Sequence, residues 1–164
     1  MPNTSWLLLR NTPEDVVATP FLKNIACKEL LAHVPHATDR PTYTIWLTRI
    51  EQIHQFVSRI PNLAWELMDY ATEPLSLVYS HTKPLFPEEV TPPEICIRLV
   101  NEHSLLRVLS PKYAWLTVAL DRLPSGACIS DRIGKDIRIK NSVWSRRPIK
   151  IMRVHDNGEF SFIP

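Results

Sequence analysis

Glycine is scarce in this sequence, and its scarcity limits the nucleotide-binding folds that the chain can adopt. Among 164 residues there are 15 prolines but only 3 glycines, Gly126, Gly134 and Gly158. Loops that cradle phosphate need glycine, because its free φ and ψ let the backbone approach the anion closely. Neither a G-x-G-x-x-G nor a G-x-x-x-x-G-K-[ST] pattern occurs. The sequence therefore excludes a Rossmann-type dinucleotide site and a P-loop.

Length and composition predict one globular domain over residues 1–164. Apolar residues make up 45% and charged residues 22% of the chain, which is the balance of an ordinary folded protein. No apolar run approaches the roughly 18 residues that a membrane helix needs. The first residues also lack the basic start and the longer apolar stretch of a signal peptide. We therefore expect a cytoplasmic protein that does not enter a membrane.

The cysteines do not indicate a metal site or a disulfide framework. Cys27, Cys96 and Cys128 are far apart, and no C-x-x-C spacing occurs. His33 and His36 lie near Cys27, but a metal also needs further ligands and supporting contacts. We interpret the cysteines as buried thiols and the histidines as surface residues.

Hydrophobic periodicity predicts a mixture of short strands and helices. The predicted strands cover residues 6–9, 42–48, 75–79, 95–100 and 115–120. The predicted helices cover residues 20–31, 48–57, 62–70 and 102–109. Asp156-Asn157-Gly158 is a strong turn signal, so residues 149–155 and 159–163 should form a closing hairpin. This mixture predicts an α/β (α+β) fold with a twisted mixed sheet and flanking helices.

The sequence also predicts the capping residues of two helices and the inward face of one. Thr48 and Glu51 fit a capping box, in which each side chain satisfies a free amide of the first helical turn. Asn62 should cap the next helix. The inward face of that helix should consist of Leu63, Leu67 and Tyr70.

Positive charge is concentrated in residues 132–153. Eight basic residues stand there against Asp136 alone, although the net charge of the whole chain is only +2. Such a stretch can attract phosphate or nucleic acid. Trp144, Arg146, Arg147 and Lys150 are the predicted nucleic-acid contacts, with the tryptophan placed to stack on a base. Charge runs discriminate poorly, and the same pattern is typical of the solvated outer face of a strand.

Several phrases of the sequence, taken in order, resemble the YrdC family. They run from Arg40-Pro41 through TRIEQIHQFVSRIPNLAWELMDYATEPLSLVY, LFPEEV, ICIRLVNEHSLL and YAWLTVAL to IKIMRVHDNGEFSFI. Catalytic members of that family make threonylcarbamoyl-adenylate from L-threonine, bicarbonate and ATP for tRNA modification. The resemblance implies a single YrdC-like domain with an open concave face on its sheet.

The motifs that carry the family's chemistry are mostly replaced in this chain. Val34 and His36 stand at the K-x-R positions, which face the triphosphate and the carboxylate in the family. The P-G-P-L-T turn becomes residues 72–76, with Glu73 where phosphates enter. Residues 119–122 stand in place of the S-x-N motif. Adenylate formation needs cations and donors aimed at the phosphates, so catalysis by the family mechanism is not expected.

Some polar residues remain as candidates for a ligand site. Arg98 stands at the position of the family's R-V after the proline-rich loop, and Ser76 keeps a hydroxyl in the altered turn. The predicted ligand-binding or phosphate-binding residues are Arg40, Ser76, Arg98 and Arg122. No catalytic residue, metal ligand or cofactor is assigned, although ATP would bind if the family site survives.

Three functions remain open from the sequence. The first is a non-catalytic YrdC-like domain that binds RNA or a nucleotide-like ligand. The second is a working threonylcarbamoyl-adenylate synthase with rearranged residues, and the third is a protein-interaction module that keeps only the fold. Fold-level resemblance does not choose among them, because function depends on the site and not on the scaffold.

Overall fold

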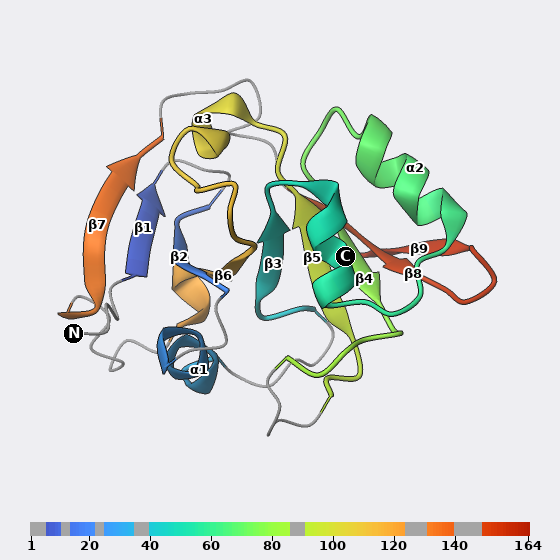
Figure 1. Ribbon diagram of the computed structural model, residues 1–164, viewed down its shortest axis with the longest axis horizontal. Helices are drawn as coiled ribbons and strands as arrows, with labels where there is room; N and C mark the ends of the chain where they lie inside the picture. The colour runs from blue at the N-terminus through green and yellow to red at the C-terminus, as the bar shows by residue number, and fades with distance from the viewer. Residues whose placement is uncertain are drawn as a thin grey trace.

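In the part of the chain that the structure describes, nine strands lie side by side in one mixed sheet, with helices packed against it (Figure 1). The computed structural model describes residues 6–10, 14–21, 25–34, 40–85, 91–123, 131–139 and 149–164. Its strands are β1 (Trp6–Arg10), β2 (Val16–Pro20), β3 (Thr44–Leu47), β4 (Leu75–Tyr79), β5 (Ile95–Leu99), β6 (Trp115–Ala119), β7 (Ile133–Arg138), β8 (Lys150–Val154) and β9 (Phe160–Ile163). Its helices are α1 (Ile25–Ala32), α2 (Asn62–Tyr70) and α3 (His103–Leu106), with 3-10 helices η1 (Ile50–Gln55) and η2 (Leu120–Arg122).

The strands follow the order β7-β1-β2-β6-β3-β5-β4-β8-β9 across the sheet. The pairs β1–β7, β3–β5 and β4–β8 are parallel, and the other neighbouring pairs are antiparallel. The two edges of the sheet are therefore β7 and β9, which both come from the C-terminal third of the sequence. The central strands are almost fully buried, as expected for short apolar runs covered on both faces.

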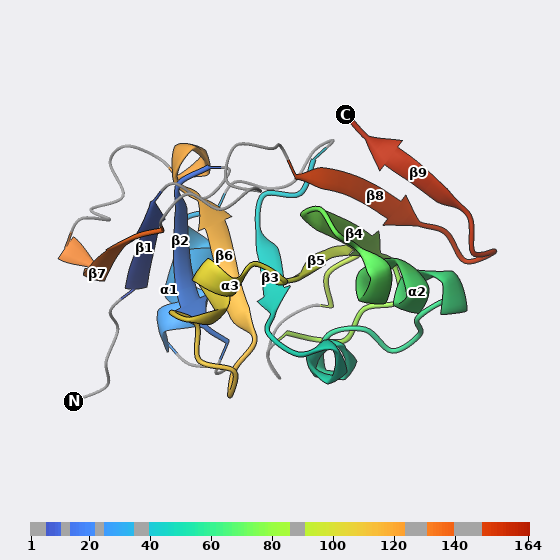
Figure 2. The ribbon, with the colours of Figure 1, turned by 90° about the horizontal axis from the view of Figure 1, so that it is seen from above.

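Side chains alternate along each strand, so the sheet has two different faces. The main apolar cluster packs α1, η1 and α2 against one face, here termed the helix face, which carries Ile45 and Leu77. The opposite face, here termed the pocket face, carries Trp46 and a smaller cluster that includes Leu105 of α3. Figure 2 shows η1 and α2 on the same side of the sheet. Within the described part of the chain, no helix is long and apolar enough to cross a membrane.

The structure confirms the predicted fold class and all of the predicted strands, with small shifts at their ends. The predicted strands include neither β2 nor β7, and the structure describes the helix predicted over residues 20–31 as α1 from Ile25 onward. Pro20 is the last residue of β2, opposite Trp115 of β6, rather than the start of a helix. Two adjacent β-branched residues, Val16 and Val17, favour the strand, and proline is tolerated at its end. The helix predicted over residues 102–109 is also shorter, since α3 covers only His103–Leu106.

The segment after β3 forms a 3-10 helix, and its capping residue is not the predicted one. The side-chain oxygen of Gln52 accepts hydrogen bonds from the backbone nitrogens of Thr48 at 2.9 Å and Arg49 at 3.1 Å. Glu51 is exposed, so the predicted capping box between Thr48 and Glu51 is wrong. The Gln52 amide also donates to the carbonyl of Pro111 at 3.2 Å. The neutral amide of Gln52 both accepts and donates hydrogen bonds here, whereas an ionised glutamate could only accept them.

Helix α2 has the predicted bounds but presents a different face to the sheet. Its buried residues are Ala64 and Met68, and its N-cap is Pro61 without a side-chain hydrogen bond. Leu63 and Tyr70, which were predicted to face inward, are 44% and 78% exposed. Leu67, the third residue predicted to face inward, is half-buried and packs against the same core cluster as Ala64. Leu63 and Tyr70 therefore form part of the solvent-exposed surface of α2.

The closing hairpin forms as predicted. Gly158 has φ +85°, a left-handed conformation in which glycine is favoured over residues with a Cβ atom. Its backbone nitrogen donates to the carbonyl of His155 at 2.9 Å, and that of Glu159 donates to the side-chain oxygen of Asn157 at 3.0 Å. These bonds set the register between β8 and β9.

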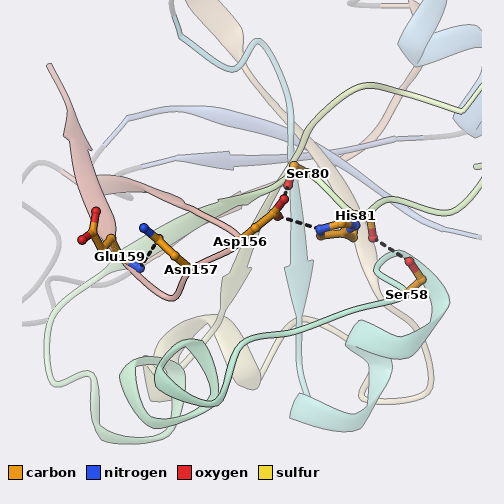
Figure 3. A network of polar contacts seen from close by, with 6 residues as sticks. All are labelled: Ser58, Ser80, His81, Asp156, Asn157 and Glu159. Carbon is orange, nitrogen blue, oxygen red and sulfur yellow. Dashed lines mark hydrogen bonds and ion pairs between the residues drawn. The ribbon is translucent and has the colours of Figure 1, made fainter.

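Asp156 connects this turn to the end of β4 (Figure 3). Its carboxylate lies 2.6 Å from Nε2 of His81 and accepts a hydrogen bond from the Ser80 hydroxyl at 3.4 Å. The Ser58 hydroxyl donates to the carbonyl of His81 at 3.2 Å, so the segment before α2 joins the network. The Ser80 hydroxyl donates to the carboxylate and not to the imidazole. This arrangement tethers the hairpin and does not activate a serine nucleophile.

The tether predicts a specific dependence of stability on pH. The hydrogen bond from His81 holds the pKa of Asp156 below its ordinary value of 3.8. A carboxyl with a lowered folded-state pKa stabilises the fold above its unfolded-state pKa, and this contribution disappears as the pH falls through the folded-state pKa. In urea unfolding, Asp156→Asn should therefore be less stable than the wild type near neutral pH, and the gap should close below about pH 4. A gap that stays constant with pH would contradict this role.

Candidate functional site

A pocket of about 350 Å³ opens on the pocket face of the sheet. Strand register brings its floor together, because Thr117 lies opposite Thr44 while Ser76 lies opposite Ile151. Trp46 lies two residues after Thr44 in β3, so its side chain is on the same face of the sheet. The full set of floor residues from the strands is Val16, Thr44, Trp46, Ser76, Thr117, Ala119 and Ile151.

The floor is polar where a sheet core is normally apolar. Thr117 is 3% exposed, and its hydroxyl donates to the carbonyl of Thr44 at 2.7 Å. Ser76 is 2% exposed. Burying hydroxyl groups costs free energy unless they are hydrogen-bonded, so such a floor suits a polar ligand better than an apolar one.

Opposite charges line the rim of the pocket. Arg40 and Arg122 stand there with Glu14 and Asp121, and all four residues are exposed. Partial burial raises the pKa of the Glu14 carboxyl, and the charge of Asp121 raises it further, while Arg122 and Arg40 oppose this shift. The rim therefore balances two cations against two carboxyl groups, without the excess of positive charge that a triphosphate requires.

Arg98 lies on the same face but is engaged by an internal partner. It sits between Trp46 and Ser76 in the ladder, and both of these line the pocket. Its side chain is fully buried and forms an ion pair with Glu102, which is also buried. The Trp46 ring lies 4.9 Å from the guanidinium carbon. Burial lowers the pKa of Arg98, and the charge of Glu102 opposes this shift.

Two guanidinium nitrogens of Arg98, Nε and Nη1, have no hydrogen-bond partner among the described residues. Arg98 does not line the pocket, because its charge is directed toward Glu102 and covered by Trp46. The predicted phosphate contact is thus placed next to the pocket floor, but not open to it.

Cys96 lies beside this floor and should be chemically inert. It is 3% exposed, and its sulfur accepts a hydrogen bond from the Thr44 hydroxyl at 3.7 Å. Burial raises the pKa of its thiol to about 11, and hydrogen bonds from Thr44 and Ser76 oppose this shift only in part. At pH 8, iodoacetamide should modify Cys96 about 100-fold more slowly in the folded than in the urea-unfolded protein. Site-resolved mass spectrometry measures this, and equal rates would refute the burial.

The structure brings some of the site residues predicted from the sequence together and separates others from them. Arg40, Ser76 and Arg122 come together around the pocket. Lys150 does not join them, because its neighbours Ile149 and Ile151 line the pocket and its own amino group lies 3.2 Å from Glu73. The predicted nucleic-acid contacts Trp144, Arg146 and Arg147 lie outside the described residues.

Acidic residues from elsewhere in the chain partly neutralise the basic stretch. Arg132 pairs with Glu29 at 2.6 Å, and Arg153 makes a two-pronged contact with Glu94 at 2.6 and 3.1 Å. Lys150 pairs with Glu73, as described above. Lys135 and Arg138 on the edge strand β7 are exposed, and no ion pair of theirs is found within the described part of the chain.

Several residues of this pocket could not be predicted from the sequence. Glu14 precedes the unpredicted strand β2, and its place on the rim follows only from the pairing of β2 with β6. Thr44 and Thr117 read as ordinary strand residues, and their register across the sheet is what makes them a polar floor. The sequence signal for this floor was Thr117, a polar residue inside an otherwise apolar predicted strand.

The described residues contain no group of three or more side chains arranged to hold a metal ion. Among the possible metal ligands predicted from the sequence, Cys27 is buried, and its thiol donates to the carbonyl of Pro20 at 3.0 Å. His36 lies outside the described residues.

No protein-family model matches this sequence, and no curated protein matches it either. Solved structures do match. A double variant of Sua5 from P. abyssi superposes with a TM-score of 0.64 at 15% identity, over 93% of this chain and 47% of that chain. P. abyssi Sua5 in complex with L-threonine gives 0.63 at 14% identity, over 92% and 47%. YciO from E. coli gives 0.62 at 15% identity, over 97% and 82%.

The likeness extends over nearly all of this chain, which spans about half the length of the Sua5 chains. At such low identity a structural match establishes the fold and not the activity. The chain has the YrdC-like fold that Sua5 and YciO share.

Proposed function

We propose that this domain binds a small polar ligand of the amino-acid or nucleotide type in the pocket, without forming an adenylate. The observation that carries the proposal is the rim of two arginines and two carboxyl groups above a hydroxyl-lined floor. The co-crystallisation of P. abyssi Sua5 with L-threonine makes L-threonine the first ligand to test.

The rim suits a ligand that carries separated opposite charges. An arginine such as Arg122 or Arg40 binds a carboxylate through charge-assisted hydrogen bonds. Glu14 and Asp121 supply negative charge for an ammonium group. The hydroxyl protons of Thr44 and Ser76 are directed at the Cys96 sulfur, so their oxygens offer acceptors to a polar side chain. A zwitterionic amino acid matches this arrangement more closely than a polyphosphate does.

Two features weigh against ATP-dependent chemistry. Phosphoryl and nucleotidyl transfer depend on cations that stabilise the charge of the phosphates. The charge of Arg98 is held by Glu102, and Lys150 is held by Glu73. The pocket rim adds two carboxyl groups of its own. We therefore place the domain among non-catalytic binders rather than synthases.

Calorimetric titration with L-threonine and with ATP tests this proposal. L-Threonine should bind, and Arg122→Ala should weaken it by about 10- to 100-fold, the value of a charge-assisted hydrogen bond. The matched control is Lys135→Ala, an exposed cation on the distant strand β7, which should leave binding unchanged. Equal effects of both variants would contradict a site at the pocket. Tight ATP binding with release of pyrophosphate, given threonine and bicarbonate, would favour the synthase instead.

RNA binding through the basic C-terminal third is a second candidate function. It is supported by the exposed cations Lys135 and Arg138 on β7, which precede Trp144, Arg146 and Arg147 in the chain. Binding of tRNA or double-stranded RNA should weaken steeply with salt. Arg146→Glu with Arg147→Glu should abolish it in fluorescence anisotropy. If this double variant binds as the wild type does, the basic stretch is only a solvated surface.

A further inference from the structure

The most exposed large apolar residues of the described chain gather around α2 and the edge strand β9. They are Leu63, Tyr70 and Phe162, with exposed fractions of 44%, 78% and 70%. Leu63 and Tyr70 line a groove of about 300 Å³ along α2, together with Leu67 and Leu75. This region is separate from the ligand pocket, which opens on the other face of the sheet.

Phe162 continues the same apolar surface across the sheet. It lies opposite Met152 of β8, which in turn lies opposite Leu77 of β4 on the helix face. Met152 and Leu75 are half-buried, and both pack against the cluster that holds α2. Figure 1 shows β8 and β9 extending the sheet beyond β4. The exposed Leu63, Tyr70 and Phe162 and the half-buried Leu67, Leu75 and Met152 together form what we term the α2–β9 surface.

The α2–β9 surface differs sharply from the opposite edge of the sheet. Edge strands are commonly protected by charged side chains, and β7 carries Lys135, Asp136 and Arg138. The sequence of β9 is Phe-Ser-Phe-Ile, without any charge. Exposed apolar patches of this kind mark interaction sites in soluble proteins.

The unpaired charges beside the apolar residues are acidic, because Lys150, which lies opposite Leu75, pairs with Glu73. Helix α2 carries Glu66 and Asp69 and no basic residue, and Glu66 lines the groove itself. Both side chains are exposed, and within the described residues neither forms an ion pair. Asp69 also lies in the last turn of the helix, where the helix dipole favours cations. The helix thus presents uncompensated negative charge next to its apolar groove.

From these observations we infer that the α2–β9 surface docks a basic amphipathic helix of a partner protein. A helix lying beside α2 over β8 and β9 would continue the helix layer, which covers β4 but leaves Phe162 open. Its apolar stripe would cover Tyr70, Leu63 and Phe162, and its lysines or arginines would face Glu66 and Asp69. Charge complementarity selects this occupant over an acidic or neutral one.

A titration with a synthetic peptide tests the inference on the full chain. The probe is a fluorescein-labelled amphipathic helix of about five turns, with leucines on one stripe and lysines along its flanks. Anisotropy should report saturable binding. The reversals Glu66→Lys and Asp69→Lys together should weaken binding by about tenfold or more, as should Tyr70→Ser with Leu63→Ser. These residues are exposed, so circular dichroism should report an unchanged fold.

Two controls separate this docking from unspecific attraction. A matched peptide with glutamate in place of every lysine should not bind. Lys135→Glu on the opposite edge should leave the affinity for the basic peptide unchanged. Binding that survives the Tyr70 and Leu63 substitutions would overturn the inference. A wild-type dimer in sedimentation equilibrium that Phe162→Ser dissolves, with no peptide binding, would also overturn it and assign the surface to a second copy.

Discussion

Replacing Glu102 with alanine is expected to lower the free energy of unfolding by about 3–5 kcal/mol. The ion pair between Arg98 and Glu102 is buried on both sides. Removal of one partner leaves an uncompensated charge in the protein interior, and two nitrogens of Arg98 already lack hydrogen-bond partners among the described residues. Guanidinium unfolding followed by circular dichroism measures the loss.

A double substitution separates the charge effect from a packing effect. Arg98→Met with Glu102→Leu replaces the pair by apolar residues of similar size, and should recover most of the stability that Glu102→Ala loses. A double variant as unstable as the single one would mean that both residues matter for shape or for another partner. If Glu102→Ala costs less than about 1 kcal/mol, the pair is not buried in solution as described.

Trp46→Ala is expected to have an effect of similar size and to disrupt the ligand pocket as well. Trp46 is 2% exposed, packs in the apolar cluster beneath α3 and also lines the pocket. Truncation of a buried tryptophan costs about 3–5 kcal/mol through lost contacts and the cavity that remains. It also removes the ring that covers Arg98. Circular dichroism is the suitable probe, because the substitution itself alters tryptophan fluorescence.

The matched control is Trp46→Phe, which keeps an aromatic ring over the guanidinium. It should cost clearly less stability than Trp46→Ala and retain L-threonine binding within about tenfold. Trp115→Phe provides a second comparison, since Trp115 belongs to the same cluster but does not line the pocket. If Trp46→Ala leaves both the stability and the ligand affinity intact, Trp46 neither supports the sheet nor shapes the pocket.

The strands of this fold could be predicted because their signals are local. Short runs such as residues 75–79 and 95–100 are apolar and β-branched, and the Asn157-Gly158 turn fixes the closing hairpin. Strand β2 escaped prediction because Pro20 also resembles the first residue of a helix. Its pairing with β6, which holds it as a strand, joins residues about a hundred positions apart.

The candidate site was only partly predictable, for a related reason. Arg40, Ser76 and Arg122 followed from the family resemblance, and the structure places all three at the pocket. Arg98 was predicted from the same resemblance, but Glu102 and Trp46 hold its charge away from the pocket. Such an internal pair depends on the direction of a side chain, which sequence order does not specify. The acidic half of the rim, Glu14 and Asp121, depends on long-range strand register.

We expect the pocket, rather than the basic stretch, to hold the small ligand. Titration of isotope-labelled protein with L-threonine, followed by amide chemical shifts, tests it most directly. We predict saturable shifts centred on Thr44, Ser76, Thr117 and Arg122, with little change at Lys135 and Arg138 on β7. Shifts confined to β7 and the basic stretch, or no shifts at millimolar L-threonine, would mean that the pocket does not bind this ligand.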